Sequence, residues 1–125
     1  MKIIESLRHK LNKNAELSGQ EKETNKIINK FLEKTNPDVH YKNVGGYGII
    51  AIYKGVEEGK NILLRADIDG LNIPMNCQQY LGTGTGAGTE FKVQCLSQSQ
   101  FSHRCGHDGH AAILCGVAMH LGKKR

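Results

Sequence analysis

Six consecutive residues near the end of the chain, Cys105 to His110, place a thiol, two imidazoles and a carboxylate on a short piece of backbone. Directly after them, residues 111–121 are apolar on nearly all sides, which is typical of a buried helix. Thiolate and imidazole are the side chains that bind zinc-like cations best. If Cys105 and His107 are extended, both side chains lie on one face and converge on one ion. The pattern therefore predicts a metal site at the start of a buried helix.

Other interpretations of these residue types have to be weighed. A lone Cys is usually a small buried hydrophobe, and a lone His is usually a satisfied polar residue. Four of the six His, at positions 103, 107, 110 and 120, lie close together, which favours ligands; His103 is the weaker candidate. A structural zinc module is disfavoured because its four residues lack short paired spacings: Cys77, Cys95, Cys105 and His107.

Apolar periodicity predicts alternating helices and strands, and therefore an α/β fold. Ile3, Ile4, Leu7 and Leu11 predict a first helix, and a capping box of Ser18 and Glu21 opens a second that ends before Pro37. Strands are predicted over residues 39–44 and 47–53, on either side of Gly45-Gly46, and over 62–66. Gly122 and the basic tail are expected to end the last helix.

Two carboxylates, Asp67 and Asp69, follow the predicted strand at 62–66. In open α/β sheets, ligands bind just outside the carboxyl ends of the strands, where an acidic residue orients a metal ligand or a water. Both residues are also turn formers, and Gly70 makes a turn an equally good interpretation of Asp69. We therefore expect Asp67 to support the site.

Composition excludes some functional classes. The net charge of +5 comes from scattered Lys and Arg without interleaved aromatics, so nucleic-acid binding is not expected. The Gly-rich residues 82–88 lack the strand before and the helix after that a dinucleotide fingerprint needs. Charges interrupt the apolar start, and no run of about 20 apolar residues exists, so neither a signal peptide nor a membrane span is expected. A cytoplasmic protein is the default expectation.

Three ordered segments resemble a known family. They are Cys105 to His110 with the apolar run behind it, Leu64-Arg65-Ala66-Asp67-Ile68-Asp69, and Leu7-Arg8-His9 through Glu16-Leu17-Ser18. Asn43-Val44-Gly45-Gly46 before an apolar strand also fits. Together they are similar to the aminoacylase/carboxypeptidase-type metal-dependent amidohydrolases, in the branch with N-acyl-amino-acid amidohydrolases, hippurate hydrolases and indole-acetyl-amino-acid hydrolases.

The resemblance implies a fold, a reaction and a site. The fold is a three-layer sandwich of helices around a mixed sheet, with residues 1–125 as its N-terminal portion and the lid (dimerisation) domain and C-terminal part absent. The reaction is hydrolysis of the amide bond of small N-acyl amino acids with two divalent ions, zinc or manganese, and a homo-oligomer is compatible with it. Cys105 and His107 are the implied metal ligands, Asp67 is the implied catalytic residue, and Asp108 or His110 supports them without touching the ion.

The chain also departs from the family. Asp69-Gly70-Leu71-Asn72-Ile73 stands where the family has Asp-Ala-Leu-Pro-Ile, and a longer Gly- and Gln-rich stretch follows Pro74. The family's Glu-Glu pair and its later His ligands lie beyond the position of Arg125. We therefore expect the isolated chain to be inactive, and a non-catalytic binding or regulatory fragment remains an alternative.

Overall fold

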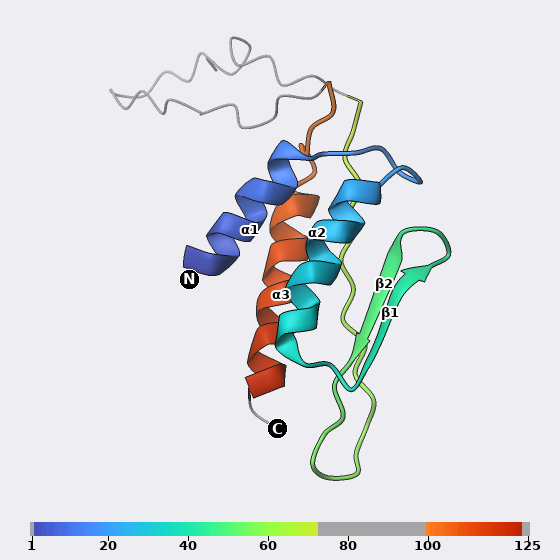
Figure 1. Cartoon of the computed structure of the whole chain (residues 1–125), viewed down its shortest axis with the longest axis vertical. Coiled ribbons are helices and arrows are strands. Elements are labelled where there is room, and N and C mark those ends of the chain that lie inside the picture. Colours follow the sequence, from blue (N-terminus) through green and yellow to red (C-terminus); the bar gives the residue numbers. More distant parts are fainter. Residues whose placement is uncertain (1, 73–99, 124–125) are drawn as a thin grey trace, which may run out of the picture.

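The computed structural model of the chain describes residues 2–72 and 100–123. In these residues the elements are α1 (Lys2–Lys13), α2 (Lys22–Leu32), the 3-10 helix η1 (Glu33–Thr35), β1 (Val39–Val44), β2 (Gly48–Ile52) and α3 (His107–Lys123). The three α-helices pack against one another, and the β1–β2 hairpin lies against α2 on the side away from α1 (Figure 1). Helices that cover a small sheet agree with the predicted α/β class.

The core forms where large side chains of α1 and α2 meet the small side chains of α3. Its buried members are Leu7, Leu11, Ile28, Leu32, Ala111, Ala112, Cys115 and Ala118. The small residues let the helices approach closely, which also explains the glycine near the end of α3. A Cβ on Gly122 would lie 1.9 Å from the Thr35 carbonyl oxygen of η1. The helix end predicted at Gly122 and the basic tail agrees with α3 to within one residue, since α3 extends to Lys123 and Gly122 lies in its last turn.

Both N-terminal helices occur where the apolar periodicity predicts them, but the predicted capping box is wrong. The N-cap of α2 is Glu21, and it makes no side-chain capping bond. Instead, the Glu16 carboxylate accepts hydrogen bonds from the backbone N–H groups of Glu23 at 3.0 Å and Thr24 at 2.8 Å. A carboxylate from the preceding loop thus satisfies the free N–H groups and complements the helix dipole.

The predicted hairpin is confirmed. β1 and β2 pair antiparallel, with Val39 opposite Ile52, and Gly45 and Gly46 adopt positive φ angles of 59° and 108° in the connection. Amide side chains of α2 hold the hairpin. Asn25 Nδ2 donates to the carbonyl oxygens of Lys42 at 2.8 Å and Tyr47 at 2.9 Å.

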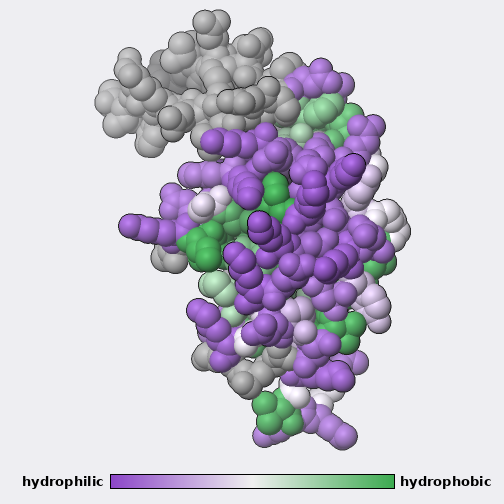
Figure 2. Space-filling model, in the orientation of Figure 1, coloured by the Kyte–Doolittle hydropathy of each residue, from purple (hydrophilic) through white to green (hydrophobic). Residues whose placement is uncertain are grey.

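The strand predicted over residues 62–66 is absent, because residues 53–69 have no regular secondary structure. Ile62 and Leu63 are 84% and 89% exposed. Figure 2 shows a largely hydrophilic face with several separate hydrophobic groups, one of them at its foot, over the loop that follows β2 in Figure 1. None of the described helices combines the length and the apolar character that a bilayer span requires.

Candidate metal centre

The Cys105–His110 motif forms a turn followed by the first turn of α3. Gly106 N–H donates to the His103 carbonyl oxygen at 2.9 Å, and Gly106 has a φ of 77°, which glycine adopts without strain. The N–H groups of Gly109 and His110 both donate to the Gly106 carbonyl oxygen at 3.0 Å. The helix therefore begins directly at the motif, as predicted. The condition under which both side chains would share one face, an extended backbone from Cys105 to His107, is not met, because Gly106 turns the chain there.

The His107 ring is held by Asp69. Its Nδ1 lies 2.9 Å from the Asp69 carboxylate Oδ1 and 2.9 Å from the Asp69 carbonyl oxygen. Both partners are acceptors, so Nδ1 carries the hydrogen and donates it. In the neutral ring this leaves the lone pair of Nε2 available, and among the described residues no hydrogen bond uses that atom. A carboxylate that fixes a histidine in this tautomer is the usual support of a metal-binding imidazole.

The backbone next to Asp69 is fixed by neighbouring segments. Gly70 N–H donates to the Glu16 carbonyl oxygen at 2.6 Å, and Leu71 exchanges two 2.9 Å backbone bonds with Ser102. The loop after α1, the loop before α3 and the Asp69 segment are thereby joined. These bonds hold Asp69 against His107 although 38 residues separate the two in sequence.

Asp67, the carboxylate that the sequence favoured, contacts a different residue. It forms an ion pair with the exposed side chain of Arg65. The structure therefore brings Asp69, and not Asp67, to His107. The Asp-x-Asp spacing contained a signal for Asp69, but the following Gly70 made it resemble a turn residue. The catalytic role of Asp67 stays a prediction.

The other motif residues differ in accessibility. Cys105 is a free, exposed cysteine, whereas Cys115 is buried and its burial raises the pKa of the thiol to about 12. His110 is exposed, and the centre of its ring lies 6.1 Å from that of His107. Asp108 is buried and directed toward α1.

His103 is buried beside the site. Burial lowers its pKa, while the nearby Asp108 carboxylate and the backbone of Asp69 oppose that change. Neither ring nitrogen makes a hydrogen bond of good geometry to the described residues. A buried ring is less suited than Cys105 or His107 to reach an ion from solvent, which agrees with the sequence analysis, where His103 is the weaker candidate ligand.

The donor set fits part of a metal site. Cys105 offers an exposed thiol and His107 an oriented imidazole, which are ligands that zinc accepts. Within residues 2–72 and 100–123, no three His, Cys, Asp or Glu side chains are grouped so as to hold a metal ion. Cys77 and Cys95 of the alternative zinc module, the Gly-rich residues 82–88 and the longer stretch after Pro74 lie outside the described residues.

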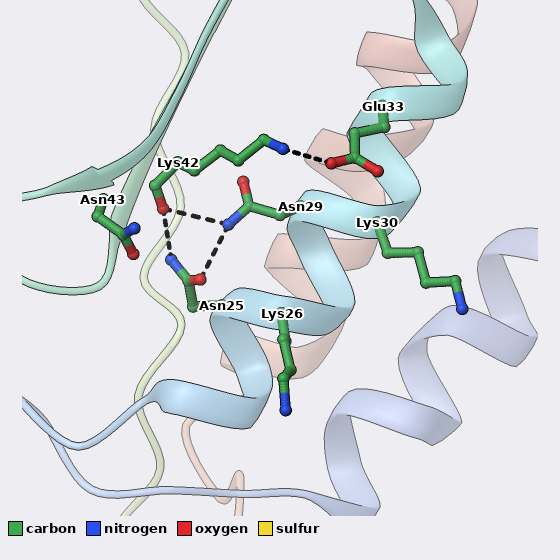
Figure 3. Close-up of a pocket in the computed structure, with 7 residues that line it drawn as sticks. All are labelled: Asn25, Lys26, Asn29, Lys30, Glu33, Lys42 and Asn43. Carbon is green, nitrogen blue, oxygen red and sulfur yellow. Dashed lines mark hydrogen bonds and ion pairs between the residues drawn. The ribbon is translucent and has the colours of Figure 1, made fainter.

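A separate depression of about 410 Å³ lies between α2 and β1, away from the motif (Figure 3). Lys42 Nζ contacts Glu33 Oε1 at 2.6 Å across it, and this bond lowers the pKa of Glu33. Asn25 and Asn29 point into it, but their amides already bond the Lys42 carbonyl oxygen. The polar side chains that line the depression thus attach the hairpin to α2.

Comparison with known proteins gives relatives over nearly the whole chain. The chain is 37% identical to N-acetylcysteine deacetylase of Bacillus subtilis, over 96% of its own length and 28% of the deacetylase. It is 32% identical to thermostable carboxypeptidase 2 of Saccharolobus solfataricus, over 98% and 28%, and 30% identical to hippurate hydrolase of Campylobacter jejuni, over 94% and 27%. No family model and no solved structure matches.

These relatives are named as amidohydrolases, deacetylases and carboxypeptidases, which are all hydrolases. The chain belongs to their family, which confirms the predicted resemblance. It spans about a quarter of the length of the curated relatives that it matches.

Proposed function

We propose that the chain supplies part of the active centre of a metal-dependent amidohydrolase that cleaves the amide bond of N-acyl amino acids. The supporting observation is the His107 ring, which Asp69 holds in the tautomer that presents Nε2, two residues from the exposed Cys105 thiol. The relatives' names add the substrate class, since they specify N-acetylcysteine, hippurate and IAA-amino acids. All are amides of amino acids.

In this proposal Cys105 and His107 bind a divalent ion, zinc or manganese, as one of two in the whole enzyme. Such an ion, when bound, lowers the pKa of a coordinated water and polarises the acyl carbonyl. Asp69 orients His107, and Asp67 or His110 completes the polar surroundings. The whole protein would have the three-layer sandwich fold, with further ligands and the general base outside the described residues.

Metal titration of the 125-residue chain tests the ligand assignment. Two protein ligands leave a tetrahedral ion half satisfied, so we expect weak binding of Co²⁺ or Zn²⁺. The thiolate-to-cobalt absorption should disappear in Cys105→Ala. Cys115→Ala is the matched control, since it removes a buried thiol and should leave the absorption unchanged. Tight binding that survives Cys105→Ala but is lost in Cys77→Ala would establish the structural zinc module instead.

Amino-acid release tests the catalytic part of the proposal. With acetyl, benzoyl and indole-acetyl amino acids and added zinc or manganese, the 125-residue chain alone should show no turnover. General base catalysis contributes about 10²–10⁴-fold. The carboxylates nearest to the motif, those of Asp67, Asp69 and Asp108, are already paired with Arg65, His107 and Arg8. Turnover that is lost in both Cys105→Ala and His107→Ala would show that the chain is sufficient.

A further inference from the structure

The carboxylate of Asp108 is buried, and its partners come from α1. The side chain is 2% exposed, and its Oδ2 accepts hydrogen bonds from Asn12 Nδ2 at 3.0 Å and Arg8 Nε at 3.3 Å. A carboxylate that has lost its water needs such partners, because an unpaired buried charge is strongly unfavourable. The first turn of α3 is therefore tied to α1 through Asp108.

The core between α1 and α3 is otherwise built from apolar side chains. Leu7 and Leu11 of α1 belong to the same cluster as Ala111, Ala112 and Cys115 of α3. Apolar packing is non-directional, whereas hydrogen bonds weaken steeply when they bend. The bonds to Asp108 thus define how far α3 is rotated about its own axis, which small apolar side chains specify less sharply.

This rotation determines where the His107 ring lies. His107 and Asp108 are consecutive residues of one helical turn, and their side chains point about 100° apart. Atoms about 5–6 Å from a helix axis move by about 2 Å when the helix rotates by about 20°. A displacement of that size would break the 2.9 Å bonds from His107 Nδ1 to Asp69. Asp69 and α1 therefore hold the same turn from two sides.

Asn12 provides an independent indication. The residue is buried, and its Oδ1 has no hydrogen-bond partner among the described residues. An unsatisfied buried amide oxygen costs free energy that an apolar side chain at the same position would avoid. The hydrogen bond that the Asn12 NH₂ group donates to Asp108 explains why an amide occupies this position. Local departures from good packing of this kind are concentrated at functional sites.

We propose that Asp108, held by Arg8 and Asn12, is a positioning residue that fixes the His107 ring for metal binding, an inference that rests on the proposed function. Asp108 acts through the helix and touches neither the ion nor His107. On this view, α1 is part of the metal centre although it contributes no ligand.

The double variant Asn12→Leu/Asp108→Ala tests the proposal, since it removes the polar contact without leaving an unpaired buried charge. Apolar replacement of a buried polar pair is often neutral for stability, so the urea midpoint should remain close to that of the wild type. Nitrogen-15 NMR of the metal-free chain should show His107 changing from one tautomer to a mixture. Co²⁺ affinity should fall by about 10–100-fold. Glu33→Gln, which removes a distant surface ion pair, is the control and should change neither.

The outcomes separate the two proposals. If Co²⁺ absorption does not depend on Cys105, the proposed ligand set is wrong, and the NMR tautomer still decides whether Asp108 positions His107. If absorption depends on Cys105 but the double variant keeps both the tautomer and the affinity, the positioning role is wrong. Should the double variant unfold, Arg8→Met removes one of the two donors from a half-exposed side chain. Arg8→Met should then give a smaller change in both the His107 tautomer ratio and the Co²⁺ affinity. No change in either quantity would overturn the inference.

Discussion

Gly122→Ala should destabilise the chain, although alanine is the better helix former. The residue lies inside α3, where a Cβ would come within 1.9 Å of the Thr35 carbonyl oxygen and 2.9 Å of the Thr35 carbonyl carbon. Real Cβ atoms essentially never approach a neighbour closer than 3.0 Å, so the end of α3 would have to withdraw from η1 by about 1.1 Å. The atoms in contact are backbone, which cannot rotate away.

The magnitude follows from two opposing effects. Replacing glycine by alanine in a helix interior stabilises by up to about 1 kcal/mol, and less near a helix end. Overpacking of a tight contact costs about 1–3 kcal/mol. We therefore expect a net loss of about 1–2 kcal/mol. Gly116→Ala is the matched control in the same helix, because its Cβ would lie 3.4 Å from the flexible end of Ile4. That change should be neutral or stabilising.

Urea unfolding followed by circular dichroism measures both variants. At equal m-values the midpoint should fall for Gly122→Ala and stay or rise for Gly116→Ala. A Gly122→Ala midpoint equal to or above that of the wild type would refute the close contact between α3 and η1.

Three further outcomes are expected. Burial and the Lys42 charge lower the pKa of His40 in the folded chain below its model-peptide value of 6.5. The contribution of His40 to folding stability is therefore present above pH 6.5 and is lost as the pH falls through the lowered pKa. His40→Gln should flatten this acid dependence of the urea midpoint, and an unchanged profile would contradict it. Iodoacetamide at about pH 8 should label the exposed Cys105 in the native chain long before Cys115, because the Cys115 thiol, with a pKa of about 12, is almost fully protonated at this pH. Equal labelling rates of the two cysteines in peptide mass mapping would disprove this expectation. The exposed apolar residues 62–64 should make the chain self-associate in light scattering, less so in Leu63→Lys, whereas a monodisperse wild-type monomer would count against it.

Local patterns were sufficient for the elements that stabilise themselves through near neighbours. α1 and α2 follow from apolar residues at helical spacing, and the hairpin follows from two strand-like runs around Gly45-Gly46. Each of these elements satisfies its own backbone or that of the adjacent strand. For such elements the sequence already contains most of the determining interactions.

The segment at 62–66 shows where local patterns fail. Its apolar run is typical of a strand, but a strand exists only when another backbone bonds to it. Within the described residues no such partner is present, and the side chains of Ile62 and Leu63 face solvent. The α2 cap failed for a related reason, since Glu16 reaches the helix from outside the predicted Ser18–Glu21 box. In both cases the missing information is the position of a group that periodicity does not encode.

The choice between Asp67 and Asp69 depends on the same kind of information. Two residues apart in an extended segment, both carboxylates point to the same side, so spacing alone cannot rank them. The ranking comes from the neighbours: Arg65 pairs with Asp67, whereas the bonds of Gly70 to Glu16 and of Leu71 to Ser102 press Asp69 onto His107. Residues from the loop after α1 and the loop before α3 thus determine that Asp69, and not Asp67, contacts His107. It follows that the geometry of this site is determined as much by residues outside the Cys105–His110 motif as by Cys105 and His107 themselves.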